Sequence, residues 1–401
     1  MNKATFQLIP GLALGHYTDR LAKTGCTVLV CERGAVPGVD IRGSASGTRE
    51  IASCQPGHLV ERIHAIVLAG GSAFGLAAAD GVMEYLEQRG VGFDVGVTHV
   101  PIVASAVVYD LGVGNPWVRP DRQAGFSATA SARPDRVEQG AVGAGTGATV
   151  GKLFGTECAS PGGFGFSELR FSTPEARRHT GAARSTRSRQ SSPPNPITVQ
   201  AFAVVNAFGD VVDPRSGQIL AGARVSPRSK KFADTVAQMK RGILRKDFKS
   251  GAGGYLNLPG SAPEREVVGR RAAQRNSRVS GSARASRRML AEQMPEAARK
   301  MFELEGADTA SRLKPQNTTL VVIATDAAFD KIQMQKIAQM AQNGLARVLR
   351  PAHTLFDGDT VFALSIFDER HRRTADVNVA GEVAAEAAAE AILAAVRTGP
   401  E

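Results

Sequence analysis

The 401-residue sequence predicts a layered α/β protein, and three observations support this fold class. Residues 318–397 alternate strand-like apolar runs with amphipathic helical patterns, the order expected where helices cover a sheet. The N-terminal portion alternates short apolar runs with glycine turns, which is typical of hairpins. The chain has 43 glycines and only 5% aromatic residues, a composition that suits tight turns and close backbone contacts.

The N-terminal elements follow from apolar runs and glycines. A strand is expected at 27–31, followed by the turn-rich segment 34–43. A second strand covers 64–68, and 103–109 is apolar and β-branched enough for another. Between these two strands, four apolar residues at helical spacing predict a helix that stops near Gly90; they are Leu76, Ala79, Met83 and Leu86.

The middle of the chain combines one clear strand with two segments that interrupt the pattern. Residues 197–205 predict a strand ending at Asn206, and a turn at 208–210 is expected to lead the chain back into the apolar run 211–213. Residues 175–196 are rich in Arg, Ser and Pro and have no periodicity, so a flexible insert is expected there. Residues 225–316 are polar and basic, with weak helical patterns only at 233–244 and 287–304, and are interpreted as a second flexible insert.

The pattern becomes regular again after residue 317. A strand is expected at 318–324, an amphipathic helix at 326–347, another strand at 361–366 and an alanine-rich helix at 378–397. The residues of the first helix expected to face the core are Ile332, Ile337, Met340, Ala341 and Leu345.

The net charge of +11 belongs to one segment. Residues 225–317 hold 20 Lys and Arg against 9 Asp and Glu, while the rest of the chain holds 29 of each. The basicity is therefore no reason to assign nucleic-acid binding to the whole protein, and a nucleic-acid partner is not expected.

Composition also limits the location and the possible cofactors. No apolar run reaches the roughly 18 residues that cross a bilayer, and the N-terminus has no signal-peptide core, so we expect a cytoplasmic protein without membrane contact. Four cysteines without metal-ligand spacing predict reduced thiols and no metal site.

The junction between Asn317 and Thr318 joins the basic segment to a buried apolar run. A cut at this bond would give Thr318 a free α-amine, so that one residue would carry both a nucleophile and a general base. The alternative is structural, because threonine is a good strand former and Asn commonly precedes a strand.

Two carboxylates follow in the sequence at Asp357 and Asp359, separated by Gly358. In an extended backbone, residues two apart point to the same side, so the pair could hold the α-ammonium and the hydroxyl of Thr318. An ordinary turn before a strand is the alternative.

Three further residues could assist such a nucleophile. Lys152 follows a run of small residues that leaves room for a ligand, and it could stabilise an anion. Asn206 ends a strand, and its amide could donate to an oxyanion, with the Tyr109 hydroxyl as a second donor. The alternatives are a surface lysine, a turn asparagine and a core tyrosine.

The loop Gly70-Gly71-Ser72 lies between an expected strand and an expected helix. It lacks the glycine spacing of dinucleotide-binding and P-loops, so nucleotide binding is not expected. Tight helix–strand packing with backbone amides facing a substrate fits the loop better.

Together and in this order, these segments resemble the P1 family of N-terminal-nucleophile (Ntn) peptidases, family S58. This family includes L-aminopeptidase/D-amidase (esterase), β-peptidyl aminopeptidases and the nylon-oligomer hydrolase. The segments that carry the resemblance are 9–19, 34–43 with 47–50, 68–76, 104–110, 145–148 with 151–152, 317–319 and 357–359.

The resemblance implies an αββα sandwich that cleaves itself into an α chain, 1–317, and a β chain, 318–401, which together form one structural domain. By motif match, Thr318 is the nucleophile and Asn317-Thr318 the cleavage site. Asp357 and Asp359 match the acidic pair, and Asn206 the oxyanion-side asparagine. Lys152 and Tyr109 match pocket residues.

The activity implied is a self-processing amide hydrolase, most closely an aminopeptidase acting on small peptides or amides, without a cofactor. A homo-oligomer of αβ units is also expected. Two other functions stay open from the sequence. One is an acyltransferase of the ornithine acetyltransferase type on a related scaffold, and the other is a binding protein that uses the basic segment 225–316.

Overall fold

The computed structural model describes residues 6–172, 196–243 and 317–397. These residues belong to one compact unit formed by 1–245 and 315–401. Segments from both sides of the predicted cleavage site therefore build the same unit.

Nine strands form the central sheet system, in the hydrogen-bonded order β10–β11–β14–β16–β2–β4–β7–β3, with β1 paired to β2. Their bounds are β1 (Ala13–Asp19), β2 (Thr24–Ile41), β3 (Thr48–Arg49), β4 (Ile63–Ala69), β7 (Val103–Val107), β10 (Gly163–Phe171), β11 (Ile197–Asn206), β14 (Thr318–Thr325) and β16 (Thr360–Ser365). The long β2 belongs to two sheets, since its first half pairs with β1 and β4 and its last residues pair with β16.

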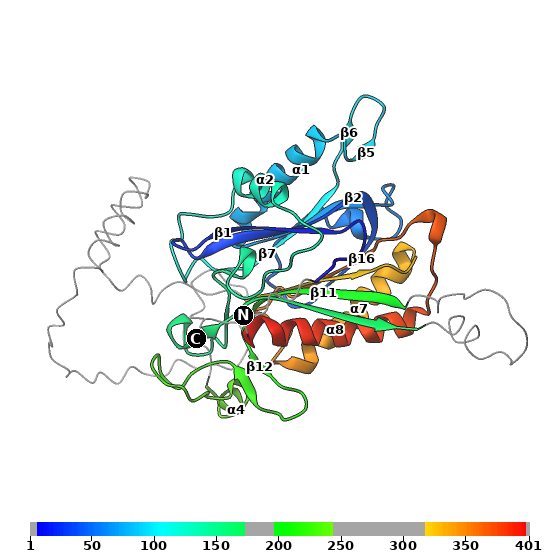
Figure 1. Cartoon of the computed structure of the whole chain (residues 1–401). Coiled ribbons are helices and arrows are strands. Elements are labelled where there is room, and N and C mark those ends of the chain that lie inside the picture. Colours follow the sequence, from blue (N-terminus) through cyan, green and yellow to red (C-terminus); the bar gives the residue numbers. More distant parts are fainter. Residues whose placement is uncertain (1–5, 173–195, 244–316, 398–401) are drawn as a thin grey trace, which may run out of the picture. The chain divides into compact units, whose positions relative to one another are not determined.

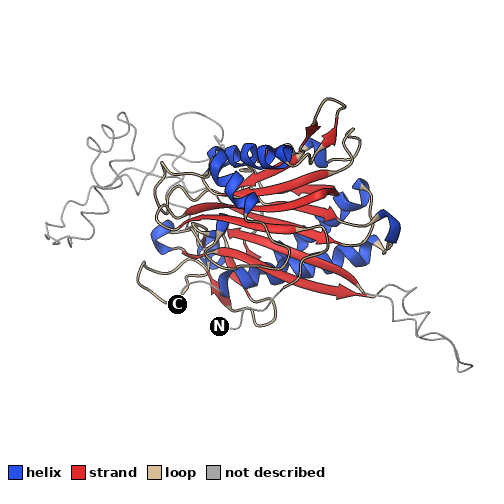
Figure 2. Ribbon diagram, turned by 45° about the horizontal axis from the view of Figure 1, so that its top comes forward, coloured by secondary structure: helices blue, strands red, loops and turns tan. Residues whose placement is uncertain are grey.

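Two helix pairs cover the outer faces of these sheets. The first pair is α1 (Ala78–Gln88) and α2 (Arg122–Ala130), which lie against β1, β2, β4 and β7. The second pair, α7 (Lys331–Val348) and α8 (Val377–Arg397), packs on β10, β11, β16 and β2. Figures 1 and 2 show the resulting order of layers, with helices on both sides of the strands. This is the αββα sandwich that the family resemblance implied.

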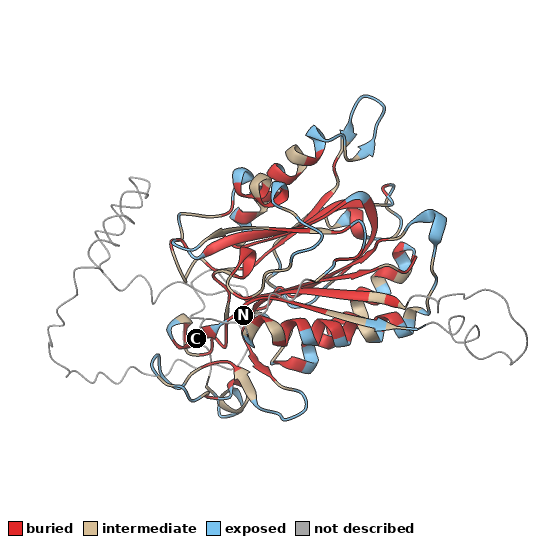
Figure 3. Cartoon of the chain, viewed as in Figure 1, coloured by how far each residue is buried: buried red, intermediate tan, exposed pale blue. Residues whose placement is uncertain are grey.

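Three apolar layers hold the sandwich together. In β14, Leu320 and Val322 join the layer between the two sheets, whereas Val321 and Ile323 face α7 and α8. A third layer fills the space between the other sheet and α1 and α2. Because both faces of β14 are buried, its sequence is an unbroken apolar run rather than an alternating one. Figure 3 shows this buried centre.

The helix predicted at 326–347 begins five residues later, at Lys331. The Asp330 side chain caps it by accepting a hydrogen bond from the Gln333 backbone amide, and the Gln333 side chain accepts one from the Asp330 backbone amide. The prediction that Ile332 faces the core is wrong, since its side chain is 69% exposed, and Met334 is buried instead.

The turn at 208–210 does not form the expected hairpin with β11. It leads into β12 (Asp210–Val212), which pairs with β13 (Ile219–Ala221) and β15 (Leu349–Arg350) in a separate sheet. Residues 225–243 were predicted to start a flexible insert. They contain α4 (Thr235–Lys240), which lies within the weak helical pattern at 233–244. The buried carboxylate of Asp210 fixes this helix by accepting hydrogen bonds from the Thr235 amide and hydroxyl. The rest of that insert, with the weak helical pattern at 287–304, and residues 175–195 lie outside the described residues.

Short elements complete the described structure. They are β5 (Phe93–Asp94), β6 (His99–Val100), β8 (Thr149–Val150), β9 (Ser160–Pro161) and 3-10 turns at Ala52–Cys54, Ser72–Ala77, Gly143–Gly145, Thr156–Cys158 and Glu369–His371. All four cysteines are buried free thiols. Among the described helices, none is long and apolar enough to span a bilayer.

Candidate active site

The Asn317–Thr318 junction lies at the start of β14, buried at the end of the sheet. Asn317 and Thr319 are fully buried and Thr318 is 3% exposed. Thr318 lies opposite Asn206 of the antiparallel β11, and Leu320 lies beside Thr360 of the parallel β16. The junction is therefore held from both sides by neighbouring strands.

Two donors meet at the carbonyl oxygen of Asn317. The Thr318 hydroxyl donates to it at 2.6 Å, and the Gly358 amide donates at 2.9 Å. The hydroxyl that would attack this carbonyl thus lies beside it, and a backbone N–H points at the oxygen where negative charge would develop.

Asp357 is buried in the loop before β16. Its carboxylate accepts hydrogen bonds from the Thr354 hydroxyl at 2.6 Å, the Thr354 amide at 3.0 Å and the Phe208 amide at 3.3 Å. Burial and then the nearby charge of Asp359 raise the pKa of Asp357 to about 6, and the Thr354 hydrogen bonds oppose the rise. The raised pKa keeps this carboxyl partly protonated in mildly acidic solution.

Asp359 has a different set of partners. One oxygen accepts the Thr319 amide at 2.7 Å, and the other accepts the His353 amide at 3.2 Å and lies 2.8 Å from His353 Nδ1. The predicted hydrogen bond from the Thr318 hydroxyl to this acidic pair is not seen in the continuous chain. The Asp359 carboxylate instead binds the Thr319 amide, whereas the Asp357 carboxylate binds Thr354 and Phe208.

His353 is a site residue that the sequence reasoning missed. Its backbone is in the left-handed region (φ 56°), and its Nε2 is buried without a hydrogen-bond partner among the described residues. A non-glycine residue in this region is uncommon and marks a backbone that its surroundings hold in place. The only signal in the sequence is the position of His353 four residues before Asp357.

Lys152, Asn206 and Tyr109 form one hydrogen-bonded group. Lys152 is 1% exposed, which excludes the surface alternative, and its Nζ donates to the Asn206 carbonyl at 3.0 Å and to Oδ1 at 2.7 Å. The Asn206 side-chain amide donates to the Tyr109 carbonyl at 3.1 Å. The backbone donor to the Asn317 carbonyl is the Gly358 amide. The Asn206 side-chain amide, which was predicted as an oxyanion donor, donates to the Tyr109 carbonyl in the continuous chain.

The Gly70-Gly71-Ser72 loop is tied to this group by Asp110, which the sequence reasoning also missed. The Gly71 amide and the Thr24 hydroxyl each donate to the Asp110 carboxylate at 2.7 Å. A Cβ on Gly70 would lie only 2.1 Å from Asp110 Oδ2, so this position requires glycine. Burial raises the pKa of Asp110, and its hydrogen bonds oppose this.

Over residues 6–172, 196–243 and 317–397, no group of three or more His, Cys, Asp or Glu side chains could hold an ion. Burial raises the pKa of Cys26, Cys31 and Cys54 to about 12, which keeps these thiols protonated and inert. The site as described offers a hydroxyl, backbone donors, a buried lysine and two carboxylates.

Comparison with known proteins identifies the family. The model of peptidase family S58 matches residues 8–163 and 185–400. The chain belongs to peptidase family S58. Among curated proteins, an uncharacterized aminopeptidase of Mycobacterium tuberculosis strain H37Rv is 36% identical over 367 residues, covering 89% of this chain and 80% of that protein.

The 6-aminohexanoate-oligomer endohydrolase of Paenarthrobacter ureafaciens is 26% identical over 399 residues, covering 96% of this chain and 84% of that enzyme. These relatives and the family model make this S58 chain a hydrolase of the peptidase and amidase class.

Solved structures confirm the fold. L-aminopeptidase D-Ala-esterase/amidase of Ochrobactrum anthropi, a variant of the Ntn hydrolase fold, aligns with a TM-score of 0.57 at 13% identity over 96% of this chain and 84% of that one. A β-aminopeptidase of Burkholderia sp. aligns with a TM-score of 0.54 at 15% identity over 98% of this chain and 88% of that one. The S58 chain therefore has the Ntn hydrolase fold that the resemblance implied.

Proposed function

We propose that this S58 hydrolase cleaves itself between Asn317 and Thr318, and that Thr318 is then the nucleophile of an aminopeptidase or amidase. The observation that carries the proposal is the geometry at the Asn317 carbonyl. Its oxygen lies 2.6 Å from the Thr318 hydroxyl and accepts the Gly358 amide at 2.9 Å. The attacking group and an oxyanion donor are thus both next to the bond to be cut.

In the first step, Thr318 Oγ1 attacks the Asn317 carbonyl carbon while its proton leaves, and the Gly358 amide stabilises the oxyanion. Collapse of this intermediate breaks the C–N bond, and the Thr318 nitrogen takes up a proton. The product is an ester between the Asn317 carbonyl and the Thr318 oxygen. Water then hydrolyses the ester, giving an Asn317 carboxylate and a free α-amine on Thr318.

The same hydroxyl then acts on a substrate amide. The freed α-amine takes the hydroxyl proton during attack and returns it to the leaving amine. The acyl-enzyme that forms is hydrolysed by water. Asp359 binds the Thr319 amide, Lys152 binds Asn206, which lies opposite Thr318, and Asp357 lies beside Asn317. We assign these three side chains the task of orienting the amine and balancing its charge.

For the substrate we propose small peptides or short amide oligomers. The support is that curated relatives carry the names aminopeptidase and 6-aminohexanoate-oligomer endohydrolase. Neither reaction, as we propose it, requires a cofactor.

Intact mass spectrometry of the purified protein under denaturing conditions tests the processing step. We expect two species corresponding to 1–317 and 318–401. Thr318→Ala should leave a single full-length chain, and Thr318→Ser should still be cut because serine retains a hydroxyl. A wild-type chain that stays whole after prolonged incubation, or a Thr318→Ala chain cut before residue 318, would refute self-cleavage.

Hydrolysis is tested separately with a set of aminoacyl p-nitroanilides and 6-aminohexanoate oligomers. The processed wild type should release product, and the uncut Thr318→Ala chain should not. Adding a primary amine as acceptor shows whether the acyl group passes to water or to the amine, which separates a hydrolase from an acyltransferase.

A further inference from the structure

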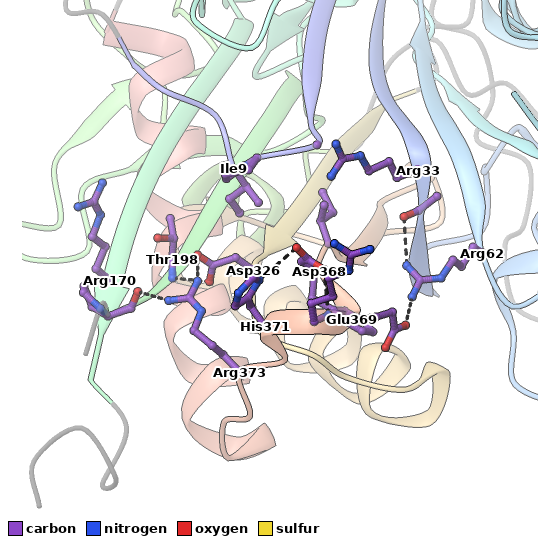
Figure 4. Close-up of a pocket in the computed structure, with 17 residues that line it drawn as sticks. Ile9, Arg33, Arg62, Arg170, Thr198, Asp326, Asp368, Glu369, His371 and Arg373 are labelled. Carbon is purple, nitrogen blue, oxygen red and sulfur yellow. Dashed lines mark hydrogen bonds and ion pairs between the residues drawn. The ribbon is translucent and has the colours of Figure 1, made fainter. Parts of the chain in front are cut away.

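A cavity of about 970 Å³ lies at the end of the strands remote from Thr318 (Figure 4). Thr318 is the first residue of β14, and Asp326, which lines the cavity, follows its last residue, Thr325. Seven strand steps of about 3.3 Å separate the two ends of β14, or roughly 23 Å. The cavity is therefore separate from the proposed nucleophile.

The lining of this cavity is rich in arginine. Five arginines face it against three carboxylates: Arg33, Arg62, Arg170, Arg370 and Arg373 with Asp326, Asp368 and Glu369. Its lining also includes the apolar residues Ile9, Ile366 and Phe367. A cavity of this size with some apolar lining and an excess of guanidinium groups is suited to a small organic anion.

Three of the arginines are fixed by the protein itself. Arg170 pairs with Glu168, which does not line the cavity, at 2.8 Å. Arg62 pairs with Glu369 at 2.6 Å, donates to the Gly34 carbonyl at 3.3 Å and lies over the Phe367 ring. A Cβ on Gly34 would come within 2.9 Å of Arg62 Cβ, so the missing side chain makes room for the arginine stem. Arg373 pairs with Asp326 and donates to the Pro196 carbonyl at 3.1 Å. These contacts account for two of the three carboxylates.

Two other arginines, Arg33 and Arg370, form no close ion pair with a described residue. Neither has a carboxylate within ion-pair distance among the residues that the structure describes, and both are exposed. Asp368, the third carboxylate, accepts the Arg370 backbone amide at 2.9 Å and lies 3.3 Å from His371, and the more distant charge of Arg33 also helps to lower its pKa. Figure 4 shows Arg33 at the opposite side of the cavity from Arg373. Guanidinium groups without a close ion pair, beside fixed ones, favour an anion between them.

We propose that this cavity binds a small organic anion that carries carboxylate or phosphate groups. Arg33 and Arg370 would contact the charged groups, and the apolar lining residues Ile9, Ile366 and Phe367 would contact the body of the ligand. The site would be independent of amide hydrolysis, since none of the described residues that line it contacts Thr318 or belongs to the candidate active site.

Isothermal titration calorimetry on the uncut Thr318→Ala chain tests this proposal, with citrate and inorganic phosphate as separate probes. Ionic strength is held constant with NaCl so that general screening does not change. We expect saturable binding of one anion per chain, and the Arg33→Ala/Arg370→Ala pair should weaken it at least tenfold. Which probe binds more tightly tells whether the site favours carboxylate or phosphate.

An Arg20→Ala/Arg228→Ala pair is the matched control, because both residues are exposed, lie outside the cavity and remove the same charge. This control should bind as the parent does. Absence of saturable binding for both probes, or equal weakening in the two double variants, would overturn the proposal. The Arg33→Ala/Arg370→Ala pair is also made in the chain that keeps Thr318, where self-cleavage shows that the variant folds. A failure of anion binding therefore does not bear on the proposed hydrolase.

Discussion

Asp357 and Asp359 are two residues apart in the sequence, yet their surroundings give them different tasks. Asp357 is bound mainly by neutral donors of Thr354 and Phe208, and its pKa is raised to about 6. Asp359 binds the Thr319 amide and the His353 ring. Asp359 therefore positions the backbone beside Thr318, whereas burial and the charge of Asp359 raise the pKa of Asp357 to about 6.

The raised pKa of Asp357 predicts a pH-dependent loss of stability. An unfolded aspartic acid titrates near its ordinary value of about 3.9, so between about pH 4 and pH 6 the folded chain binds more protons than the unfolded chain. The free energy of unfolding should therefore fall as pH rises through this window. Urea unfolding of the Thr318→Ala chain at several pH values measures it, and adding Asp357→Asn should make the fall shallower. Parallel pH curves for the two chains would show that Asp357 is not the source.

His353 should affect self-cleavage through Asp359. Its ring lies 2.8 Å from the Asp359 carboxylate, and losing a hydrogen bond to a charged group costs about 1.5–3 kcal/mol. If that cost appears in the barrier, His353→Ala slows processing about tenfold or more. His353→Asn accepts the same left-handed backbone and so separates the ring from the backbone conformation. The cleavage rate is followed by gel after rapid purification, with the exposed His99→Ala as control, and unchanged rates in both His353 variants would contradict this role.

At the scale of elements, the sequence predicted those parts whose signal is local. The ends of β14, β16 and α8 agree within about one residue, because burial on two faces or a long alanine-rich face leaves a clear pattern. The separate sheet of β12 was not predicted, because one of its two partners, β15, lies far along the chain. Lys152 and Asn206 were recognised, but their contact, and the parts played by His353 and Asp110, depend on loops brought together only by folding.

The loop before β16 packs closely against the backbone of Ala45 and Ser46 at Gly358. A Cβ there would lie 2.5 Å from the Ala45 carbonyl oxygen and 2.7 Å from Ser46 Cα, so Gly358→Ala should displace the loop. The amide of Gly358 would then leave the Asn317 carbonyl. Loss of one such donor typically slows a reaction about 10²–10³-fold, and we expect processing to slow by at least tenfold. Gly112→Ala is the control, since its nearest neighbour would be 3.9 Å away. Equal cleavage rates in the two variants would argue against an oxyanion role for this amide.

Lys152 connects its loop to the end of β11. In Lys152→Met the side chain keeps its length, but the Asn206 carbonyl and Oδ1 lose the ammonium donor in a buried place. Leaving buried acceptors unpaired costs about 1–3 kcal/mol, and we expect the free energy of unfolding to fall by this amount. Urea unfolding of the Thr318→Ala chain with and without the change measures it. Lys336→Met, on the exposed side of α7, is the control and should change the free energy of unfolding little. An equal fall in this free energy for the two variants would contradict the role of the buried Lys152 hydrogen bonds.

For the whole molecule, the two ends of the sandwich have different chemistry. The Thr318 end combines buried carboxylates, a buried lysine and backbone donors, while the other end carries the arginine-lined cavity. Each end is built from residues far apart in the sequence, and the strands between them are buried on both faces. A single buried core thus supports both regions.

The basic segment before the cleavage site provides a last test at this scale. All contacts described around Thr318 come from 1–245 and 315–401, so replacing 246–314 with a flexible linker of about 15 Gly and Ser residues should preserve folding and self-cleavage. A change in loop length alters the closure entropy only slightly. The deleted segment holds 14 Lys and Arg against 8 Asp and Glu, so its removal lowers the formal net charge from +11 to +5. Intact mass should show a shortened α chain and an unchanged β chain beginning at Thr318, and the same deletion with Thr318→Ala should stay whole. A deletion chain that keeps the wild-type circular dichroism spectrum but is no longer cut would show that 246–314 takes part in processing.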